Sequence, residues 1–280
     1  MRRSGSAVRR AAVVTHGKAR TIGPALARLQ SVARESGVEL LFAPEEAEKH
    51  GIEPSRYDPA EADVALVLGG DGTILRALSR FLGTGVPVIG VNFGRVGFLT
   101  AIERDELESG VARVFAGDYE VVELPTLELA LNGDTWRAVN DVVATSATIG
   151  RLVELGWAIG GEDLGVQPCD GLICATPSGS TAYNLSNGGP VLVWGLEAMV
   201  LTFIAPHSLS ARPLVVGPGA DLIVWNRTPD VPVSVLVDGH PVAELAPAAR
   251  AVVRLCGERS LLGTLPESTF FTRYRETFGP

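Results

Sequence analysis

The pentapeptide "GGDGT" at 69–73 combines residue types that suit the transfer of a phosphoryl group. It joins an apolar run at 63–68, typical of a buried strand, to a stretch at 73–82 with helical spacing. Glycines at such a junction let a ligand approach the N–H groups of a helix N-terminus, which favour phosphate. Asp71 would be costly among phosphates unless it accepts a proton or holds Mg²⁺. The pattern therefore predicts phosphoryl transfer, and the alternative is a glycine-rich turn in which Asp71 only caps a helix.

The glycines and the hydroxyl of this loop are predicted to bind phosphate, with Thr73 as the N-cap of the helix. The loop has neither the G-x4-G-K-[ST] spacing of a P-loop nor the G-x-G-x-x-G spacing of a dinucleotide fold. The predicted phosphate-loop residues are Gly69, Gly70, Gly72 and Thr73.

A second loop lies within "DGLICATPSGSTAYNLSNGGP" at 170–190. The apolar strand at 172–175 is followed by a turn rich in hydroxyls and glycine, which can bind phosphate and ribose oxygens. Tyr183 can stack on a base, and Asp170 can accept a hydrogen bond from a ribose hydroxyl or an adenine amine. The alternative is a Ser/Thr loop that caps a helix.

The elements around the first loop indicate an α/β domain with a parallel sheet covered on both faces, because apolar strands alternate with helices there. Residues 51–60 are expected to form a loop. The expected strands are 11–16, 38–43, 63–68 and 86–92, and the expected helices are 21–35, 73–82 and 103–116.

The pattern changes after about Glu120 to strand-length segments divided by Gly, Asn, Asp and Pro. Residues 127–144 read as a hairpin around Asn132-Gly133-Asp134. We therefore expect two domains: an α/β domain at 1–120, with 263–280 packing back on it, and a mostly β domain at 121–262.

The composition of the chain excludes several classes of protein. The 280 residues are 46% hydrophobic, enough for a substantial core, and the net charge of −8 argues against a general nucleic-acid binder. The odd number of cysteines, three, indicates reduced thiols and a cytoplasmic protein. No apolar stretch is long enough to span a membrane, so no membrane partner is expected.

Together the two loops resemble the NAD kinase family. The similar segments occur in the family's order: "GGDGT" (69–73), "VNFGRVGFLT" (91–100), "VNDV" (139–142), the 170–190 block and "PHSLSARPLVV" (206–216). The resemblance implies a two-domain kinase that transfers a phosphoryl group from ATP, or from polyphosphate, to the adenosine-ribose 2′-hydroxyl of NAD. It also implies a divalent cation, usually Mg²⁺, and a homodimer or homotetramer with dinucleotide sites near a subunit interface.

The resemblance also implies roles for individual residues. Asp71 is the catalytic carboxylate that polarises or deprotonates the 2′-hydroxyl, and Gly72 approaches the dinucleotide with its backbone. No residue is assigned as a metal ligand. The other implied NAD-binding residues are Asn140, Asp141, Arg151, Asp170, Thr181, Ala182, Tyr183, Asn184, Leu185, Ser186, Ala205 and His240.

The sequence departs from the family pattern at three positions. Asp141 replaces a more usual Glu, Asn187 stands where Ala is usual, and His240 stands where Gln is common. These departures bear on the choice between NAD and NADH rather than on the reaction. Two other functions stay open from sequence: a kinase of a lipid or sugar hydroxyl that shares the GGDGT loop, and a non-catalytic dinucleotide sensor.

Four further polar residues have two readings each. Arg95 either meets ATP phosphates or supports a tight loop. His207 and Arg212 are interpreted as side chains at the domain interface rather than at the ligand, and Lys18 as a solvated lysine.

Overall fold

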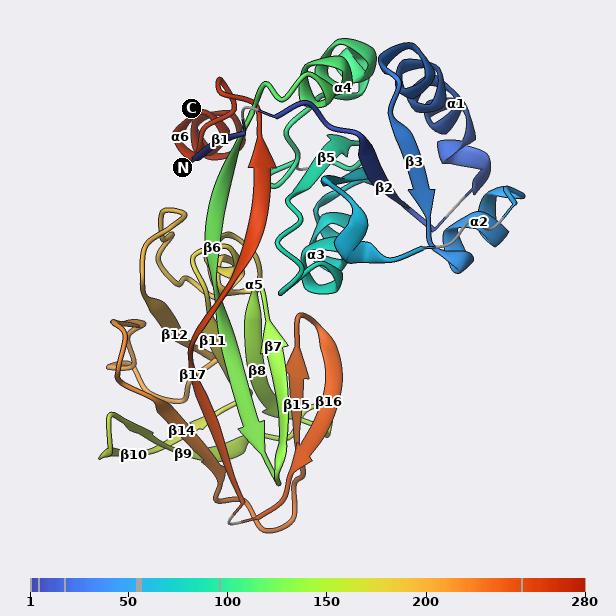
Figure 1. Ribbon diagram of the computed structural model, residues 1–280. Coiled ribbons are helices and arrows are strands. Elements are labelled where there is room, and N and C mark those ends of the chain that lie inside the picture. Colours follow the sequence, from blue (N-terminus) through green and yellow to red (C-terminus); the bar gives the residue numbers. More distant parts are fainter. Residues whose placement is uncertain are drawn as a thin grey trace. The chain divides into compact units, whose positions relative to one another are not determined.

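The computed structural model describes residues 2–4, 6–17, 19–53, 57–95, 97–247 and 249–279. The chain forms two compact units (Figure 1). Unit 1 comprises residues 1–123 and 260–280, and unit 2 comprises residues 124–259. The predicted domain boundaries are 120/121 and 262/263, so each differs from a unit boundary by only three residues.

Unit 1 contains a parallel sheet with the strand order β17-β5-β4-β2-β3. β4 lies in the middle and all six of its residues are buried, which is why its sequence is a continuous apolar run. The short β1 (Arg2–Ser4) pairs antiparallel with the start of β6 (Tyr119–Leu131). The strands of the parallel sheet are β2 (Arg10–Thr15), β3 (Glu39–Phe42), β4 (Val64–Gly69), β5 (Val88–Asn92) and the end of β17 (Arg250–Thr264).

The helices of unit 1 include the three predicted from sequence and two that were not predicted. The unpredicted α2 reads "PEEAEKH" and has no apolar periodicity; it begins at a proline and ends before Gly51, which has φ 63°. In the predicted 51–60 loop, a 3₁₀ turn at Pro59–Glu61 is capped by Asp58. The helices are α1 (Ala19–Ser36), α2 (Pro44–His50), α3 (Asp71–Arg80), α4 (Leu107–Phe115, after a 3₁₀ turn at Arg104–Glu106) and α6 (Phe270–Phe278).

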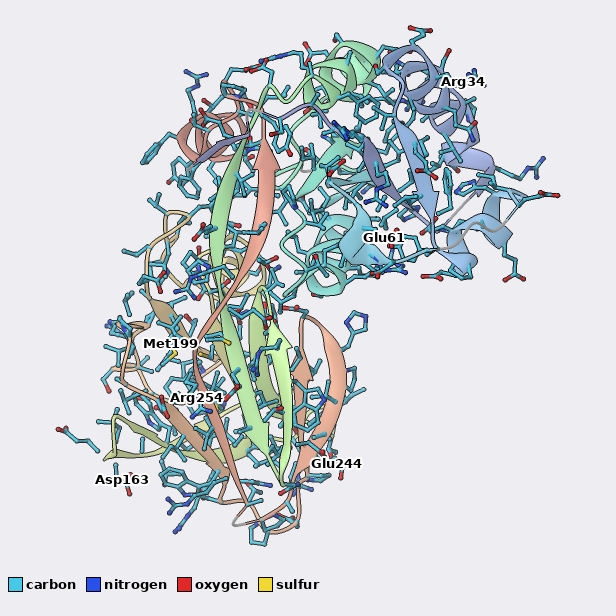
Figure 2. All side chains as sticks on the ribbon, in the orientation of Figure 1. Arg34, Glu61, Asp163, Met199, Glu244 and Arg254 are labelled. Atoms are coloured by element: carbon cyan, nitrogen blue, oxygen red, sulfur yellow. The ribbon has the colours of Figure 1, made fainter. Side chains whose placement is uncertain are left out.

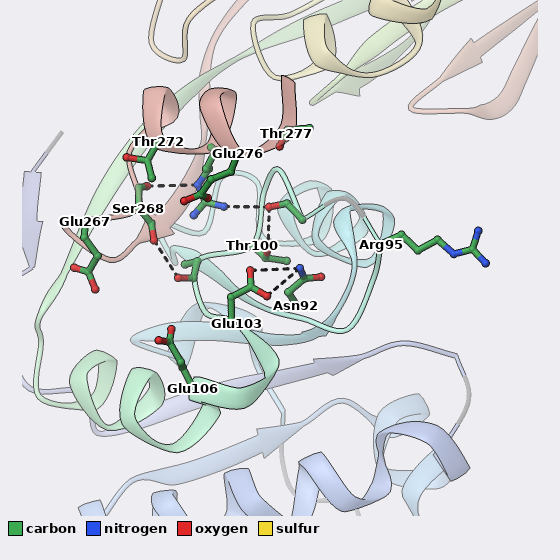
Figure 3. A pocket seen from close by; sticks show the side chains of 13 residues that line it. Asn92, Arg95, Thr100, Glu103, Glu106, Glu267, Ser268, Thr272, Glu276 and Thr277 are labelled. Atoms are coloured by element: carbon green, nitrogen blue, oxygen red, sulfur yellow. Dashed lines mark hydrogen bonds between the residues drawn. The ribbon is translucent and has the colours of Figure 1, made fainter. Parts of the chain in front are cut away.

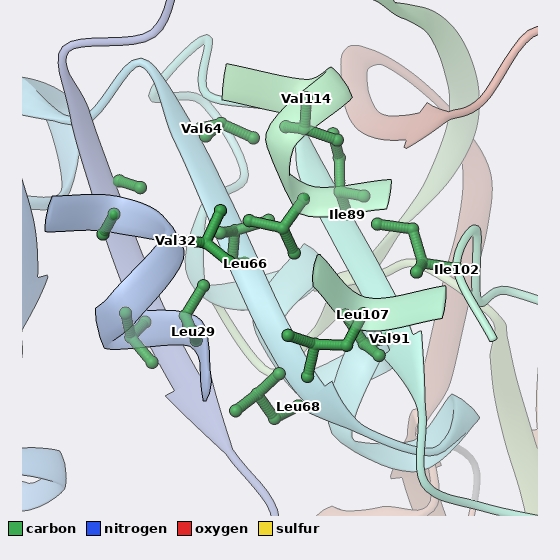
Figure 4. Packing of buried hydrophobic residues seen from close by; sticks show 14 of the residues in the cluster. Leu29, Val32, Val64, Leu66, Leu68, Ile89, Val91, Ile102, Leu107 and Val114 are labelled. Carbon is green, nitrogen blue, oxygen red and sulfur yellow. The ribbon is translucent and has the colours of Figure 1, made fainter. Parts of the chain in front are cut away.

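The core of unit 1 lies between the sheet and the helices α1 and α4 (Figure 4). Leu66 and Leu68 of β4 contribute to one cluster with side chains from both helices, such as Leu29 and Leu107. α3 packs closely on β5, because a Cβ at Gly90 would lie 2.3 Å from Ile74 Cδ1. This close packing fixes the start of α3 against the sheet.

Unit 2 is built almost entirely of antiparallel strands. One sheet has the order β13-β12-β11-β8-β15-β16, and β9, β10, β14, β17, β6 and β7 form further antiparallel pairs. Met199, marked in Figure 2, is fully buried in the core between them, where Cys174 Sγ lies 3.6 Å from its Sδ. The additional strands are β7 (Asp134–Ala138), β8 (Asp141–Ser146), β9 (Val153–Ile159), β10 (Glu162–Cys169), β11 (Gly171–Ala175), β12 (Met199–Ile204), β13 (Leu214–Val216), β14 (Leu222–Asn226), β15 (Val233–Val237) and β16 (His240–Leu245).

The predicted hairpin at 127–144 is confirmed for residues 127–138, whereas residues 141–144 belong to β8 in the other sheet. β6 pairs with β7, and Leu131 faces Asp134 across a two-residue turn. Asn132 and Gly133 both have positive φ, 55° and 92°, as this kind of turn requires. The predicted fold class, an α/β domain followed by a mostly β domain, is confirmed by both units.

Candidate active site

Asp71 is the first residue of α3, and its carboxylate is held by two backbone N–H groups. Phe98 N donates to Oδ2 at 3.0 Å and Leu99 N donates to Oδ1 at 2.9 Å. Asp71 is only partly buried, so a ligand can still reach it. The chain therefore presents an oriented carboxylate at a helix N-terminus, where the helix dipole favours its negative charge.

Close packing requires glycine at positions 69 and 94 near Asp71, whereas a Cβ at Gly72 would meet nothing within 4 Å. A Cβ at Gly94 would lie 2.9 Å from Gly70 Cα, and Phe93 N donates to Gly69 O at 2.9 Å. A Cβ at Gly69 would lie 2.6 Å from the side chain of Thr73. Two loops that follow neighbouring strands, β4 and β5, thus pack directly on each other.

The prediction that Thr73 caps α3 is wrong. The helix begins two residues earlier than predicted, at Asp71, and Gly70 is the N-cap. Thr73 is therefore inside the first turn, where its side chain is buried. The alternative reading of Asp71 as a simple cap also fails, because its carboxylate bonds the 98–99 backbone rather than its own helix.

A cavity of about 500 Å³ opens beside this loop in unit 1. Backbone at the N-terminus of α3 and the cationic side chain of Arg76 both face it. Such a combination suits the phosphates of a nucleotide. The neighbouring Lys18 lies outside the described residues. The lining residues are His16, Thr21, Ile22, Gly70, Gly72, Thr73, Arg76, Phe93 and Gly94.

In unit 2, Asn140 and Asp141 occupy a turn that is fixed by another acid, Asp238. The Asp238 carboxylate accepts hydrogen bonds from the N–H groups of Val139 (3.0 Å), Asn140 (2.7 Å) and Asp141 (3.2 Å). Asp238 follows β15, which pairs with β8, and it has φ 48°. Asp238 is a structurally important residue that sequence reasoning missed; its only local signal is the turn dipeptide Asp238-Gly239.

The Asp141 side chain is 5% exposed. Within the described part of the chain, no donor hydrogen-bonds its carboxylate, whereas its backbone O accepts from Asp238 N at 3.0 Å. Burial, and to a lesser extent the charge of Asp238, raise the pKa of Asp141 to about 7. A buried carboxyl group without a partner is suited to bind the hydroxyls of a ligand.

The pairing of β11 with β8 determines where the 170–190 block lies. Ala175, the last residue of β11, faces Asp141, so the turn after β11 lies against Asn140. Thr176 Oγ1 donates to Val139 O at 2.6 Å, and Ser178 Oγ donates to Asn140 Oδ1 at 2.9 Å. The hydroxyl-rich loop and the Asn-Asp turn therefore form one hydrogen-bonded site in unit 2.

The residues after this turn form a 3₁₀ turn at Gly179–Thr181 and the short α5 (Tyr183–Ser186). Tyr183 is 44% exposed, whereas Asn184 is fully buried. Asn184 Nδ2 donates to Ser180 O and Pro190 O, and its Oδ1 accepts from Thr202 Oγ1 at 2.7 Å. Asn184 therefore holds the loop together from inside, and Tyr183 is better placed to meet a ligand.

Another set of predicted residues lies at the opposite end of β11. Asp170 immediately precedes β11, its N–H donates to Ile204 O at 3.0 Å, and Ala205 follows with φ 42°. Thr176 lies six residue steps of extended chain after Asp170, which corresponds to roughly 20 Å. Arg151 forms an exposed ion pair with Asp230 at 2.9 Å.

His240 lies near the Asn-Asp turn instead, with Nδ1 3.0 Å from Asp238 O. Asn187 donates to Tyr183 O at 3.0 Å, so this departure from the family pattern braces α5. The structure thus brings Asn140, Asp141, His240 and the 176–186 loop together, and it leaves Asp170 and Ala205 at the far end of the sheet.

The cysteines show no sign of activation. Burial raises the pKa of Cys169 to about 12 and also raises that of Cys174. Across the described residues, no three His, Cys, Asp or Glu side chains are grouped to hold a metal ion. No helix in the described ranges is long and apolar enough to cross a membrane.

The fold and the two loops are typical of a phosphotransferase, with a carboxylate in a glycine-rich loop of an α/β unit and a hydroxyl-rich loop in a β unit. Comparison with known proteins identifies the family. The family profile described as the ATP-NAD kinase N-terminal domain matches residues 31–119, and that of the ATP-NAD kinase C-terminal domain matches residues 139–262. The chain belongs to the NAD kinase family.

Individual relatives agree with this assignment. The chain is 42% identical to the NAD kinase of Gemmatimonas aurantiaca, over 78% of this chain and 77% of that protein. It is 39% identical to NAD kinase 2 of Streptomyces coelicolor, over 96% of this chain and 88% of that protein.

Two solved structures share the fold. Yeast NADH kinase complexed with NADH has a TM-score of 0.83 at 24% identity, covering 98% of this chain and 88% of that chain. An NAD kinase from Archaeoglobus fulgidus in complex with ATP has a TM-score of 0.75 at 25% identity, covering 96% and 97%.

Proposed function

We propose that this NAD kinase family member transfers the γ-phosphoryl group of ATP to the adenosine-ribose 2′-hydroxyl of NAD, giving NADP, with Asp71 as the catalytic carboxylate. The observation that carries the proposal is the Asp71 carboxylate, which the N–H groups of Phe98 and Leu99 fix beside a cavity of about 500 Å³. Each carboxylate oxygen has a further lone pair with which to accept the proton of a ribose hydroxyl.

The role of Asp71 follows from the chemistry of phosphoryl transfer. A ribose hydroxyl is a poor nucleophile, and catalysis depends mainly on positioning and on neutralising charge. A carboxylate within hydrogen-bond reach adds general-base assistance worth roughly 10²–10⁴-fold in rate. Its two backbone hydrogen bonds keep the acceptor oriented before the substrate arrives.

The phosphates of ATP are assigned to the cavity lined by Gly70, Gly72, Thr73 and Arg76. A divalent cation, Mg²⁺ by preference, fits this arrangement because Mg²⁺ commonly binds through substrate phosphates, waters and only one or two carboxylates. When bound, the cation would neutralise phosphate charge. Polyphosphate is the alternative donor.

The dinucleotide is assigned to the Asn140-Asp141 turn and the 176–186 loop of unit 2. Asp141 would bond ribose hydroxyls, because its buried carboxyl group has no donor among the described residues. Tyr183, with its exposed ring, would contact the adenine.

Asp170, just before β11, and Ala205, just after β12, lie too far from the Asn-Asp turn to join the same binding site within one subunit. We assign them to the dinucleotide site of a neighbouring subunit in a homodimer or homotetramer, located in the cytoplasm. The measurement that checks this is the mass of the protein in solution, by light scattering. A monomer that retains full activity would refute the assignment.

The activity is tested by incubating the purified chain with Mg²⁺, ATP and NAD. The product is measured with an NADP-specific dehydrogenase, which accepts only the dinucleotide that carries the 2′-phosphate. Parallel reactions replace ATP with polyphosphate and NAD with NADH. NADP formation is expected with ATP. Absence of product with either donor would overturn the proposal. The comparisons give no support to a lipid or sugar kinase or to a non-catalytic sensor.

A further inference from the structure

A buried arginine of the C-terminal helix α6 contacts the loop that holds Asp71. Arg273 is 5% exposed, and its Nη1 donates to Phe98 O at 3.1 Å and to Gly97 O at 3.4 Å. The same guanidinium also reaches Thr264 Oγ1 (Nη2, 3.3 Å) and Ser268 O (Nε, 3.4 Å). All of these residues belong to unit 1.

The carbonyls that Arg273 binds belong to the same two peptide groups that bind Asp71. The peptide joining Gly97 to Phe98 has its C=O on Arg273 and its N–H on Asp71 Oδ2. The next peptide, joining Phe98 to Leu99, has its C=O on Arg273 and its N–H on Asp71 Oδ1. Two peptide groups in a row therefore stand between one cation and one carboxylate.

We propose that Arg273 is a positioning residue for the NAD kinase reaction, which fixes and polarises the two peptide groups that orient the Asp71 carboxylate. This inference rests on the catalytic role proposed for Asp71. Neither the mechanism above nor the resemblance to the family assigns a role to Arg273.

The charges support this arrangement from both ends. A peptide dipole is favoured when its oxygen faces a cation and its N–H faces an anion, and hydrogen bonds to ionised groups are roughly twice as strong as neutral ones. Burial lowers the pKa of Arg273 to about 10, with the charges of Asp71, Glu276 and Glu103 opposing the change, so the guanidinium stays charged at neutral pH.

The geometry of the loop explains why it needs such a brace. Gly97 has φ 76°, and a Cβ there would lie 2.5 Å from Asn92 Nδ2, so the loop turns sharply at this point. Residues 97–99 carry the Asp71 donors but belong to no helix or strand. Nη1 binds both loop carbonyls, while Nη2 and Nε of the forked guanidinium bind Thr264 and Ser268. The single ammonium of a lysine is less suited to tie these groups together at once.

Arg273 also lines a cavity of about 710 Å³, with Asn92, Glu103 and Glu276 among its other walls (Figure 3). Asn92 Nδ2 lies 3.4 Å from Glu103 Oε2 on that wall. Water in this cavity can hydrate the two carbonyls when the guanidinium is removed. We therefore expect Arg273 variants to fold.

The test compares Arg273→Met and Arg273→Lys with Arg275→Met. Arg275 lies on the same helix, is exposed, and contacts neither Gly97 nor Phe98 in the described structure, so this control removes the same charge without breaking the brace. Arg273→Met should lower kcat by about 10- to 100-fold, with the KM values for ATP and NAD changed less than about threefold. Arg273→Lys should recover part of kcat, and Arg275→Met should leave it unchanged.

Hydrogen exchange followed by NMR gives a readout that does not depend on activity. The Phe98 and Leu99 amides should exchange at least about tenfold faster in Arg273→Met than in the wild type, with no change in Arg275→Met. If the wild type made no NADP, the proposed function would be wrong. The exchange measurement would still show whether Arg273 holds the loop at 97–99.

Two results would overturn the proposal. One is unchanged exchange of both amides in Arg273→Met. The other is a kcat equal to that of the wild type, or a loss of activity that lies entirely in the KM values. If Arg273→Met did not fold, Arg273→Lys would decide by the same two measurements, because it keeps the charge and loses the fork.

Discussion

Replacing Asp141 with asparagine should stabilise unit 2 at high pH and have almost no effect at low pH. The buried carboxyl has a pKa of about 7 in the folded chain against an ordinary value of 3.8. Between these values the folded state keeps a proton that the unfolded state has lost, so stability falls as pH rises through this window. The asparagine side chain of the variant resembles the protonated acid in shape and cannot ionise.

The size of the effect follows from the pKa difference. The shift is about three pKa units, and each unit corresponds to about 1.4 kcal/mol, so the full difference is on the order of 4 kcal/mol. Asp141→Asn should therefore match the wild type in free energy of unfolding near pH 4 and exceed it by up to about 4 kcal/mol near pH 8.

Urea unfolding followed by tryptophan fluorescence measures this difference. All four tryptophans, at positions 136, 157, 194 and 225, belong to unit 2, so the signal reports the unit that contains Asp141. Asp134→Asn, at an exposed position at the start of β7, serves as the control for removing a carboxylate from unit 2. A stability difference that is the same at pH 5 and pH 8, or a variant less stable than the wild type at pH 8, would refute the reasoning.

Three further substitutions test other parts of the structure. Gly179→Ala would place a Cβ 2.1 Å from Asn140 O and displace the Asn-Asp turn. Calorimetry should therefore show an NAD affinity reduced at least about tenfold. The control Gly217→Ala, where a Cβ would meet nothing within 4 Å, should bind NAD normally. Asn184→Leu removes three buried hydrogen bonds and should cost about 2–4 kcal/mol in urea unfolding; a cost below about 1 kcal/mol would contradict its bracing role. Arg113→Ala breaks an exposed network with Asp118 and Glu267 and should change stability by less than about 1 kcal/mol, and a larger loss would show that the network matters more than its exposure suggests.

The fold of unit 1 is largely predictable because its elements differ sharply in pattern. The run "VALVLG" of β4 is apolar throughout because a central parallel strand is buried on both faces. The sequence pattern does not predict helix α2, because four of the seven residues of "PEEAEKH" are charged and its buried Glu46 is hydrogen-bonded to Thr15 and Lys49. The periodicity of apolar residues indicates which apolar side chains are buried, so it does not detect a helix that packs through polar side chains.

The residues of the candidate site likewise divide into those that the sequence predicts and those that it does not. The Asp71 loop and the 170–190 block are visible in the sequence because each concentrates its chemistry within a few residues. Asp238 and Arg273 are not visible, because they act on backbone groups 97 to 99 and 175 to 176 residues away. Strand pairing and the return of the C-terminal segment to unit 1 create these contacts, and no local motif encodes them.

The central claim is that Asp71 acts on the reacting hydroxyl rather than simply binding the dinucleotide. The most direct measurement compares kcat for NADP formation with the Kd for NAD in Asp71→Asn and in the wild type. We predict that kcat falls by roughly 10²–10⁴-fold while the Kd changes less than about threefold. A Kd that weakens as much as kcat falls, or a kcat within about threefold of the wild type, would contradict the claim.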